Sequence, residues 1–218
     1  IADSKIIADA FPMVPEMARE IACGRIINKG TIGGSLCLAD PQGDPPVALL
    51  ALDATMRVVG AEGMRNIPIR DFFISLYTTA LRNDEILQDI LIPPMKPGSV
   101  TAYGKFAARK AMDYTSTIST AVRLIRGNTG RIDEIFIGFG GLGDTPVYSE
   151  NIETFLTGAL PSDALFRQLK EKLFVLLEPI SDHLYSANYK RHVAAVTLRR
   201  TIMKAYAGVW DGEGVLIR

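Results

Sequence analysis

The chain has 218 residues, of which 24 are basic and 24 acidic, so its formal net charge at pH 7 is +0. A chain of this length can bury a sizeable core, either as one large domain or as two small ones. Because the charges balance, no overall field attracts nucleic acid or an anionic membrane, and we expect neither as a partner.

The cysteine content and the hydropathy pattern indicate a cytoplasmic protein. Cys23 and Cys37 are the only cysteines, which argues against a disulfide-dense secreted domain, and both are interpreted as packing residues. No apolar run reaches the roughly 20 residues that a membrane-spanning helix requires. No spacing of these cysteines with His183 and His192 fits zinc, haem or an iron–sulfur cluster, so no metal site is expected on this chain.

The first part of the chain is predicted to combine short helices with strands. Apolar residues at helical spacing predict a helix over residues 11–23, with prolines near its start, where a missing N–H costs little. A second helix is expected over residues 46–54, entered through a proline in its first turn. The strands expected in this part cover residues 55–59, 64–69 and 86–92.

A proline-rich stretch over residues 93–99 predicts a domain boundary. Three prolines and a glycine in this stretch cannot continue a helix or a central strand. We therefore divide the chain into residues 1–96 and 97–218.

The second part is predicted to be a small antiparallel sheet packed against a helical layer. Its expected strands cover residues 100–109, 116–125 and 131–139, the last two forming a hairpin. Three helices are expected over residues 149–156, 162–177 and 186–207, with Ser162 as an N-cap. We expect this part to bury its own core without help from upstream.

Between the two predicted helices of the first part lies a glycine-rich stretch, Thr31-Ile32-Gly33-Gly34-Ser35. Glycine adopts a positive φ at little cost, so we predict a tight turn here. The backbone N–H groups of such a turn can form a nest for an anion such as a diphosphate. The alternative interpretation is a plain turn without a ligand, which is a common role of glycine pairs.

Further motifs follow in order along the chain. They are Ala39-Asp40-Pro41, Asp44, Glu85-Ile86-Leu87, Ile92-Pro93, Tyr103-Gly104-Lys105-Phe106 with Arg109 and Asp113, Gly140-Gly141-Leu142-Gly143-Asp144-Thr145-Pro146, Tyr189-Lys190-Arg191 and Leu198-Arg199-Arg200. Together with the glycine stretch, this series resembles the flavin subunit of the molybdenum hydroxylases, the family that includes carbon monoxide dehydrogenase medium subunits and xanthine dehydrogenases. The resemblance covers nearly the whole chain.

The resemblance implies an α+β fold. Residues 1–96 would be the C-terminal part of a PCMH-type FAD-binding domain. Residues 97–218 would be a small antiparallel sheet with three helices, as in the C-terminal domain of the CO dehydrogenase flavoprotein. The chain begins at Ile1, downstream of the family's other cofactor loop, so we expect it to be a fragment of a longer subunit.

The resemblance also implies FAD as the cofactor. Thr31, Ile32, Gly33, Gly34 and Ser35 match the family stretch that contacts FAD, where backbone amides and hydroxyls can hold phosphate or ribityl oxygens. The redox chemistry of such a site belongs to the cofactor, so no side chain is expected to act as a catalytic acid or base.

Three further side chains match cofactor-binding positions of the family. Asp44 matches an aspartate that hydrogen-bonds FAD, and an N-cap for the following helix is its structural alternative. Leu87 matches an apolar residue against the flavin ring, or is a buried strand leucine. Lys105 matches a lysine beside the ring, or is a solvated surface lysine. Arg109 and Asp113 are expected to form a structural ion pair.

The implied function is that of an oxidoreductase subunit. Substrate would be oxidised at a molybdenum cofactor on one partner subunit, and electrons would pass through [2Fe-2S] clusters on an iron–sulfur subunit to FAD on this chain. FAD would then reduce an external acceptor. A partner subunit, or a second copy in a homodimer, would cover the apolar surface that the fragment exposes.

The alternative function is a docking scaffold that binds partner subunits without a cofactor. It rests on the alternating apolar and basic residues of the last predicted helix. These are Tyr189, Lys190, Arg191, Leu198, Arg199 and Arg200.

Overall fold

The computed structural model describes residues 1–107 and 117–208. In chain order its elements are α1 Lys5–Ala10, α2 Met13–Arg19, α3 Gly24–Lys29, α4 Ile32–Leu38, α5 Asp44–Ala51, β1 Thr55–Gly60, β2 Gly63–Pro68, α6 Ile69–Phe72, β3 Phe73–Ser75, β4 Thr78–Thr79, β5 Ile86–Leu91, β6 Ser99–Phe106, β7 Ile118–Arg126, β8 Ile132–Gly140, α7 Glu150–Leu156, α8 Asp163–Leu176 and α9 Ala187–Ala207. Within the described ranges, no helix is long and apolar enough to cross a membrane.

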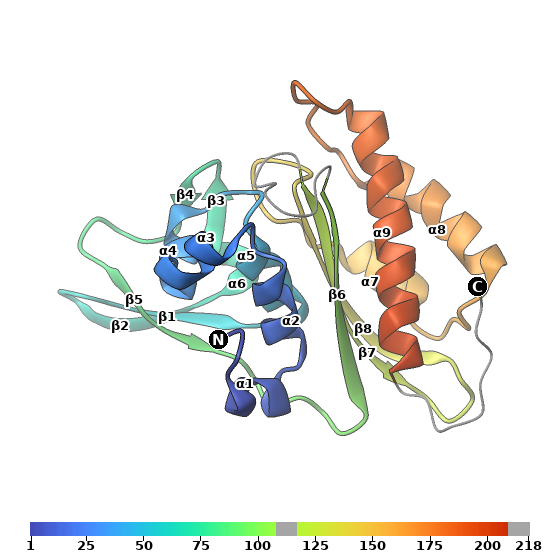
Figure 1. The fold of residues 1–218 in the computed structure, drawn as a ribbon, viewed down its shortest axis with the longest axis horizontal. Coiled ribbons are helices and arrows are strands. Elements are labelled where there is room, and N and C mark those ends of the chain that lie inside the picture. The colour runs from blue at the N-terminus through green and yellow to red at the C-terminus, as the bar shows by residue number, and fades with distance from the viewer. Residues whose placement is uncertain (108–116, 209–218) are drawn as a thin grey trace.

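The first part of the chain forms a three-stranded antiparallel sheet in the order β2-β1-β5, with short helices beside it (Figure 1). Gly63 closes the β1–β2 hairpin with φ +110°, a conformation that suits glycine. The two predicted strands of this hairpin and the predicted third strand are confirmed. The short β3–β4 hairpin was not predicted.

The predicted helix over residues 11–23 is wrong at its C-terminal end. Helix α2 stops at Arg19, and the cap residue Glu20 donates its amide to Met17 O and Ala18 O. The next turn is broken because Ala22 has a φ of +32°, which an L-residue rarely adopts.

Helix α5 lies at the centre of the molecule. All eight of its residues are buried, and a helix that is apolar on every side is expected to be covered on every side. It packs against β7 and β8 on one side and against α2 and α4 on the other. Figure 1 shows α5 and α2 on one face of the β6–β7–β8 sheet and α9 on the opposite face.

The second part of the chain is an antiparallel sheet in the order β6-β7-β8, covered by α7, α8 and α9. The predicted hairpin of β7 and β8 is confirmed. The predicted helices are confirmed as well, and the Ser162 hydroxyl accepts the Leu165 amide as an N-cap. The shared core of the sheet and these helices contains Phe139, Leu169 and Leu198.

The two faces of this sheet carry side chains of different size, because successive residues of a strand point to opposite faces. On β7, Ile118, Val122 and Leu124 join the core under α9. Ala121 faces α5 instead and belongs to a core cluster with Val47.

The second part buries a core of its own, because all buried residues of the cluster under α9 lie between Ala102 and Ala205. Its folding without help from upstream stays a prediction, because the other face of its sheet is covered. Tyr103 and Ala121 are buried in one cluster with residues of α2 and α5, so one face of the sheet is covered by the first part of the chain. The exact boundary between residues 96 and 97 stays a prediction.

A glutamate accepts one outward backbone amide on each edge strand of this sheet. Glu16 of α2 accepts the Tyr103 amide of β6 at 3.2 Å and also pairs with Lys204 of α9. Glu153 of α7 accepts the Ile137 amide of β8 at 2.7 Å.

Candidate functional site

The glycine-rich stretch begins a helix, so the predicted tight turn is wrong. Thr31 is the N-cap of α4, and its hydroxyl accepts the Gly34 amide at 3.0 Å. Gly33 and Gly34 lie in the first helical turn and neither has a positive φ. The predicted nest of free amides is thereby reduced, because an N-cap side chain satisfies one of the donors that a helix start leaves open.

Helices α4 and α5 and the segment around α2 and α3 surround a cavity of about 720 Å³. Most of its lining is apolar. The cavity brings together five of the sequence-predicted site residues and the end of the α2 segment, and its lining includes Ile21, Thr31, Ile32, Gly34, Ser35 and Asp44.

Three of the sequence-predicted residues, Gly33, Leu87 and Lys105, do not line this cavity. Gly33 lies in the same helical turn as Gly34, but it is not part of the lining. Leu87 lies on β5 opposite Val58 of β1, where it packs half-buried against a core cluster that contains Leu36. The position of Leu87 therefore favours the strand-leucine interpretation.

Asp44 is the first residue of α5, and the N-cap of that helix is Gly43. The predicted N-cap role of Asp44 is wrong, because its carboxylate points to β6 instead. Its Oδ2 lies 2.7 Å from Lys105 Nζ, and its Oδ1 accepts the Tyr103 hydroxyl at 2.5 Å. The side chain is only 6% exposed.

Lys105 is not a solvated surface lysine. Its side chain is 5% exposed, and its ammonium also donates to the backbone oxygen of Glu20 at 3.0 Å. A buried charge needs a partner of opposite charge and further hydrogen bonds, and Asp44 and Glu20 provide them.

Tyr103 is a member of this cluster that was not predicted as a site residue. The available signal is the period of two along β6, which places residues 103 and 105 on one face of the strand. Gly104 between them faces α9, where an added Cβ would lie 2.2 Å from Thr201 Oγ1. The close approach of α9 thus explains the glycine in the Tyr-Gly-Lys motif.

Burial shifts the pKa values of this cluster. Burial raises the pKa of Asp44 above its ordinary value, and the Lys105 ammonium and the Tyr103 hydroxyl lower it part of the way back. Burial, together with the neighbouring Asp44, raises the pKa of Tyr103 well above 10. Tyr103 is therefore a neutral hydrogen-bond donor to Asp44 at physiological pH.

Two family models match the chain. Residues 1–95 match the FAD binding domain in molybdopterin dehydrogenase, and residues 102–205 match the CO dehydrogenase flavoprotein C-terminal domain. The glyceraldehyde dehydrogenase medium chain of Sulfolobus acidocaldarius is 33% identical over 210 residues, which cover 96% of this chain and 72% of that protein. The chain belongs to the FAD-binding medium subunits of the molybdenum hydroxylase family.

Other relatives agree with this assignment. The nicotine 6-hydroxylase medium subunit of Paenarthrobacter nicotinovorans is 35% identical over 207 residues, which cover 95% of this chain and 71% of that subunit. The structure of reconstituted CO dehydrogenase from Oligotropha carboxidovorans matches with a TM-score of 0.88 at 30% identity, covering 94% of this chain and 71% of that chain. The predicted α+β fold of a flavin-binding part followed by a CO dehydrogenase flavoprotein C-terminal part is confirmed.

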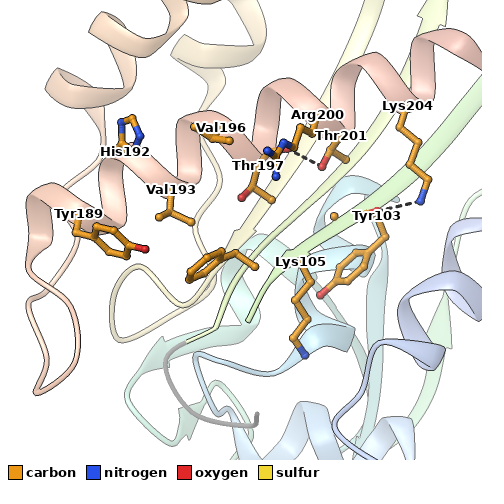
Figure 2. A pocket seen from close by; sticks show the side chains of 12 residues that line it. Tyr103, Lys105, Tyr189, His192, Val193, Val196, Thr197, Arg200, Thr201 and Lys204 are labelled. Atoms are coloured by element: carbon orange, nitrogen blue, oxygen red, sulfur yellow. Dashed lines mark hydrogen bonds between the residues drawn. The ribbon is translucent and has the colours of Figure 1, made fainter. Parts of the chain in front are cut away.

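In this medium subunit a second hollow, a groove of about 540 Å³, lies between β6 and α9. Figure 2 shows His192, Arg200 and Lys204 along α9 on one side of it. Tyr103 and Lys105 leave β6 with their side chains directed away from α9, toward the first part of the chain (Figure 2). The Asp44–Lys105 pair therefore lies in the wall between the groove and the cavity beside α4.

The predicted basic face of α9 is not a continuous exposed surface. Lys190 and Leu198 are buried, and Arg199 pairs with Asp163 of α8. Arg200 lines the groove.

Two remaining expectations concern an ion pair and metal sites. The expected ion pair of Arg109 and Asp113 lies outside the described residues. Over the ranges that the structure describes, histidine, cysteine and carboxylate side chains form no group of three that could hold a metal.

Proposed function

We propose that this chain is the flavin subunit of a molybdenum hydroxylase complex and binds FAD in the cavity between α4 and α5. The observation that carries this proposal is the gathering of Thr31, Ile32, Gly34, Ser35 and Asp44 around one cavity. These residues were selected from the sequence alone, and Asp44 comes from a different helix than the other four.

The cavity fits a flavin in size and chemistry. Ligand pockets of proteins usually enclose roughly 300–1,000 Å³ and are mostly apolar with a few polar groups, and this cavity encloses about 720 Å³. The apolar side chains of Ile21 and Ile32 suit a ring system, and the hydroxyls of Thr31 and Ser35 suit polar oxygens. In the described chain, the amide of Ile32, which lines the cavity, forms no hydrogen bond and remains available as a donor.

Asp44 and Lys105 would supply the charges of this site. FAD supplies the electron-carrying chemistry when it is bound, and the protein positions the ring and tunes its electrostatics. Asp44 lines the cavity and can accept a hydrogen bond from a ligand N–H. Lys105 lies one contact further away, behind Asp44, and acts on the cavity through its positive charge. Leu87 beside the ring stays a prediction.

The electron path is part of the proposal. FAD on this chain would accept electrons from [2Fe-2S] clusters on an iron–sulfur subunit, after substrate oxidation at a molybdenum subunit, and would pass them to an external acceptor. Support comes from the relatives, whose names describe them as medium chains and medium subunits. One matching structure is of a CO dehydrogenase that lacks the Mo-pyranopterin moiety of its molybdenum cofactor.

The direct test is the absorption spectrum of the purified chain, with and without added FAD. Gly34→Val should abolish flavin retention, because a Cβ at this position would lie 2.8 Å from Thr31 Oγ1 and displace the N-cap. Gly33→Ala is the matched control. It meets no atom within 4 Å, so FAD should be retained. Normal FAD content in Gly34→Val would overturn the assignment of this cavity.

The scaffold function remains the second candidate. The pairing of Arg199 and the burial of Lys190 and Leu198 leave little of the basic face that suggested it. Wild-type protein that shows no flavin spectrum at any FAD concentration, yet retains partner subunits, would favour the scaffold.

A further inference from the structure

Three buried polar side chains from two elements form a continuous hydrogen-bonded cluster behind the cavity. Tyr103 donates to one oxygen of Asp44 at 2.5 Å, and Lys105 donates to the other at 2.7 Å. The side chains of Asp44 and Lys105 are 6% and 5% exposed, and Tyr103 is 3% exposed. Of the three, only Asp44 lines the cavity.

Beyond these two donors, the start of α5 favours the charge of Asp44, which is the first residue of that helix. The Glu20 carboxylate is the other charged group that acts on it, and as a like charge it favours the protonated form. Around Tyr103, Glu16 and Lys204 contact the backbone amide and oxygen rather than the phenol. The side chains that donate hydrogen bonds to the ionised Asp44 are those of Lys105 and Tyr103.

We propose that Tyr103 is a positioning residue for the flavin: its hydroxyl holds Asp44 ionised and in place, so that the carboxylate neutralises Lys105 beside the cavity. This inference rests on the proposed function, because it concerns the charge that the flavin experiences. It adds a residue outside the cavity lining, which acts on the cofactor only through Asp44.

The physical consequence follows from the cost of an unsatisfied buried oxygen. Without the phenol hydroxyl, Asp44 Oδ1 loses the donor that stabilises its charge. The balance between the two forms of Asp44 then shifts toward the protonated carboxyl. The Lys105 ammonium is then left uncompensated and favours added negative charge on a neighbouring flavin.

The test is Tyr103→Phe, which removes a single oxygen and leaves the ring in its core cluster. In the FAD-free protein at pH 7, infrared difference spectra should show one additional protonated carboxyl group, which is absent from the wild type and from the Tyr103→Phe/Asp44→Asn double variant. In FAD-loaded protein the reduction potential of the flavin should rise. Tyr206→Phe is the matched control, because Tyr206 lies on α9 and its hydroxyl donates to Gly130 O in the turn between β7 and β8, and it should change neither quantity.

The two measurements separate the inference from the function on which it rests. Failure of the wild type to bind FAD would overturn the proposed function, while the infrared result would still decide the state of Asp44. An unchanged carboxyl spectrum in Tyr103→Phe would overturn the positioning role. A wild-type spectrum in which Asp44 is already protonated at pH 7 would overturn it as well, without any need for the variant to fold.

Discussion

The β6–β7–β8 sheet meets a helix on each of its two faces, and the two contacts are built differently. Under α9 the sheet presents large apolar side chains such as Ile118, Val122 and Phe139. Under α5 it presents Ala121, Gly138 and Gly140, with Tyr103 beside them in the same core cluster. A Cβ added to Gly138 would lie 2.3 Å from the backbone oxygen of Val47.

The two faces of this sheet therefore have different tasks: one forms an apolar core with α9, and the other positions the start of α5. The α9 face is an ordinary apolar core, whose free energy comes from burying large side chains. On the α5 face, small residues such as Gly138 leave room for the helix backbone to lie close to the sheet. Close approach brings Asp44, at the start of α5, within hydrogen-bonding distance of Tyr103 and Lys105 on β6.

The largest expected loss in the free energy of unfolding comes from breaking the Asp44–Lys105 ion pair on the α5 face. Asp44→Asn leaves the Lys105 charge buried without its partner, and such changes cost about 3–5 kcal/mol. Lys105→Met added to Asp44→Asn removes the unpaired charge and should recover part of this loss in urea unfolding experiments. A double variant that is no more stable than Asp44→Asn would show that the charge is not the cause.

Filling the small-residue surface tests the close approach itself. Gly138→Ala should cost about 1–3 kcal/mol in the free energy of unfolding, because the new Cβ meets the α5 backbone and one of the two elements must move. Gly143→Ala is the control, since its Cβ would meet no atom within 4 Å. Equal stability of the two variants in urea titrations would contradict the tight contact.

A smaller effect is expected on how stability depends on pH, through Glu153 of α7 beside the edge strand β8. Burial raises the pKa of Glu153 from its ordinary value of 4.5 to about 7, although the Ile137 amide and Arg70 oppose the shift. Between these two pH values the folded protein holds more protons than the unfolded chain. This contribution to stability is therefore fully present below pH 4.5 and is lost as the pH rises through 7.

Glu153→Gln keeps an acceptor for the Ile137 amide and removes the charge. The dependence of Tm on pH between 4.5 and 7 should become flatter, and Tm at pH 8 should increase. Parallel curves for the variant and the wild type would assign the pH dependence to other groups, among which Asp44 also has a raised pKa.

The smallest effect is expected on the α9 face. The hydroxyls of Thr120 and Thr201 lie 2.7 Å apart in the core, and Thr201 also donates to Thr197 O. Thr120→Val should cost about 1 kcal/mol, the typical net value of one hydrogen bond. If calorimetry shows that Thr120→Val loses as much stability as Asp44→Asn, the two faces of the sheet do not differ in the way described.

Local patterns of the sequence predicted much of the fold. The alternation in β1, β2, β7 and β8 and the turn residues between them are signals within a few residues of one another. The N-cap of α8 at Ser162 is a signal of the same kind.

Features that depend on packing between distant segments could not be predicted in the same way. Asp44 and Lys105 are separated by 61 residues, and only the approach of α5 to the sheet brings them together. The glycine pair of α4 was predicted to form a turn because glycine adopts a positive φ at little cost. In the structure, the Thr31 cap and the burial of Leu36 outweigh this preference.

The glutamates on the two edge strands bear on how this subunit avoids unwanted self-association. An exposed strand edge offers unpaired N–H and C=O groups to any other chain that can add a strand. Glu16 occupies the Tyr103 amide on β6, and Glu153 occupies the Ile137 amide on β8. A carboxylate at each of these amides also repels the carbonyl oxygens of an incoming strand. These two amides are thereby unavailable to an added strand, and on β8 the backbone of Phe139 is also paired with Val147.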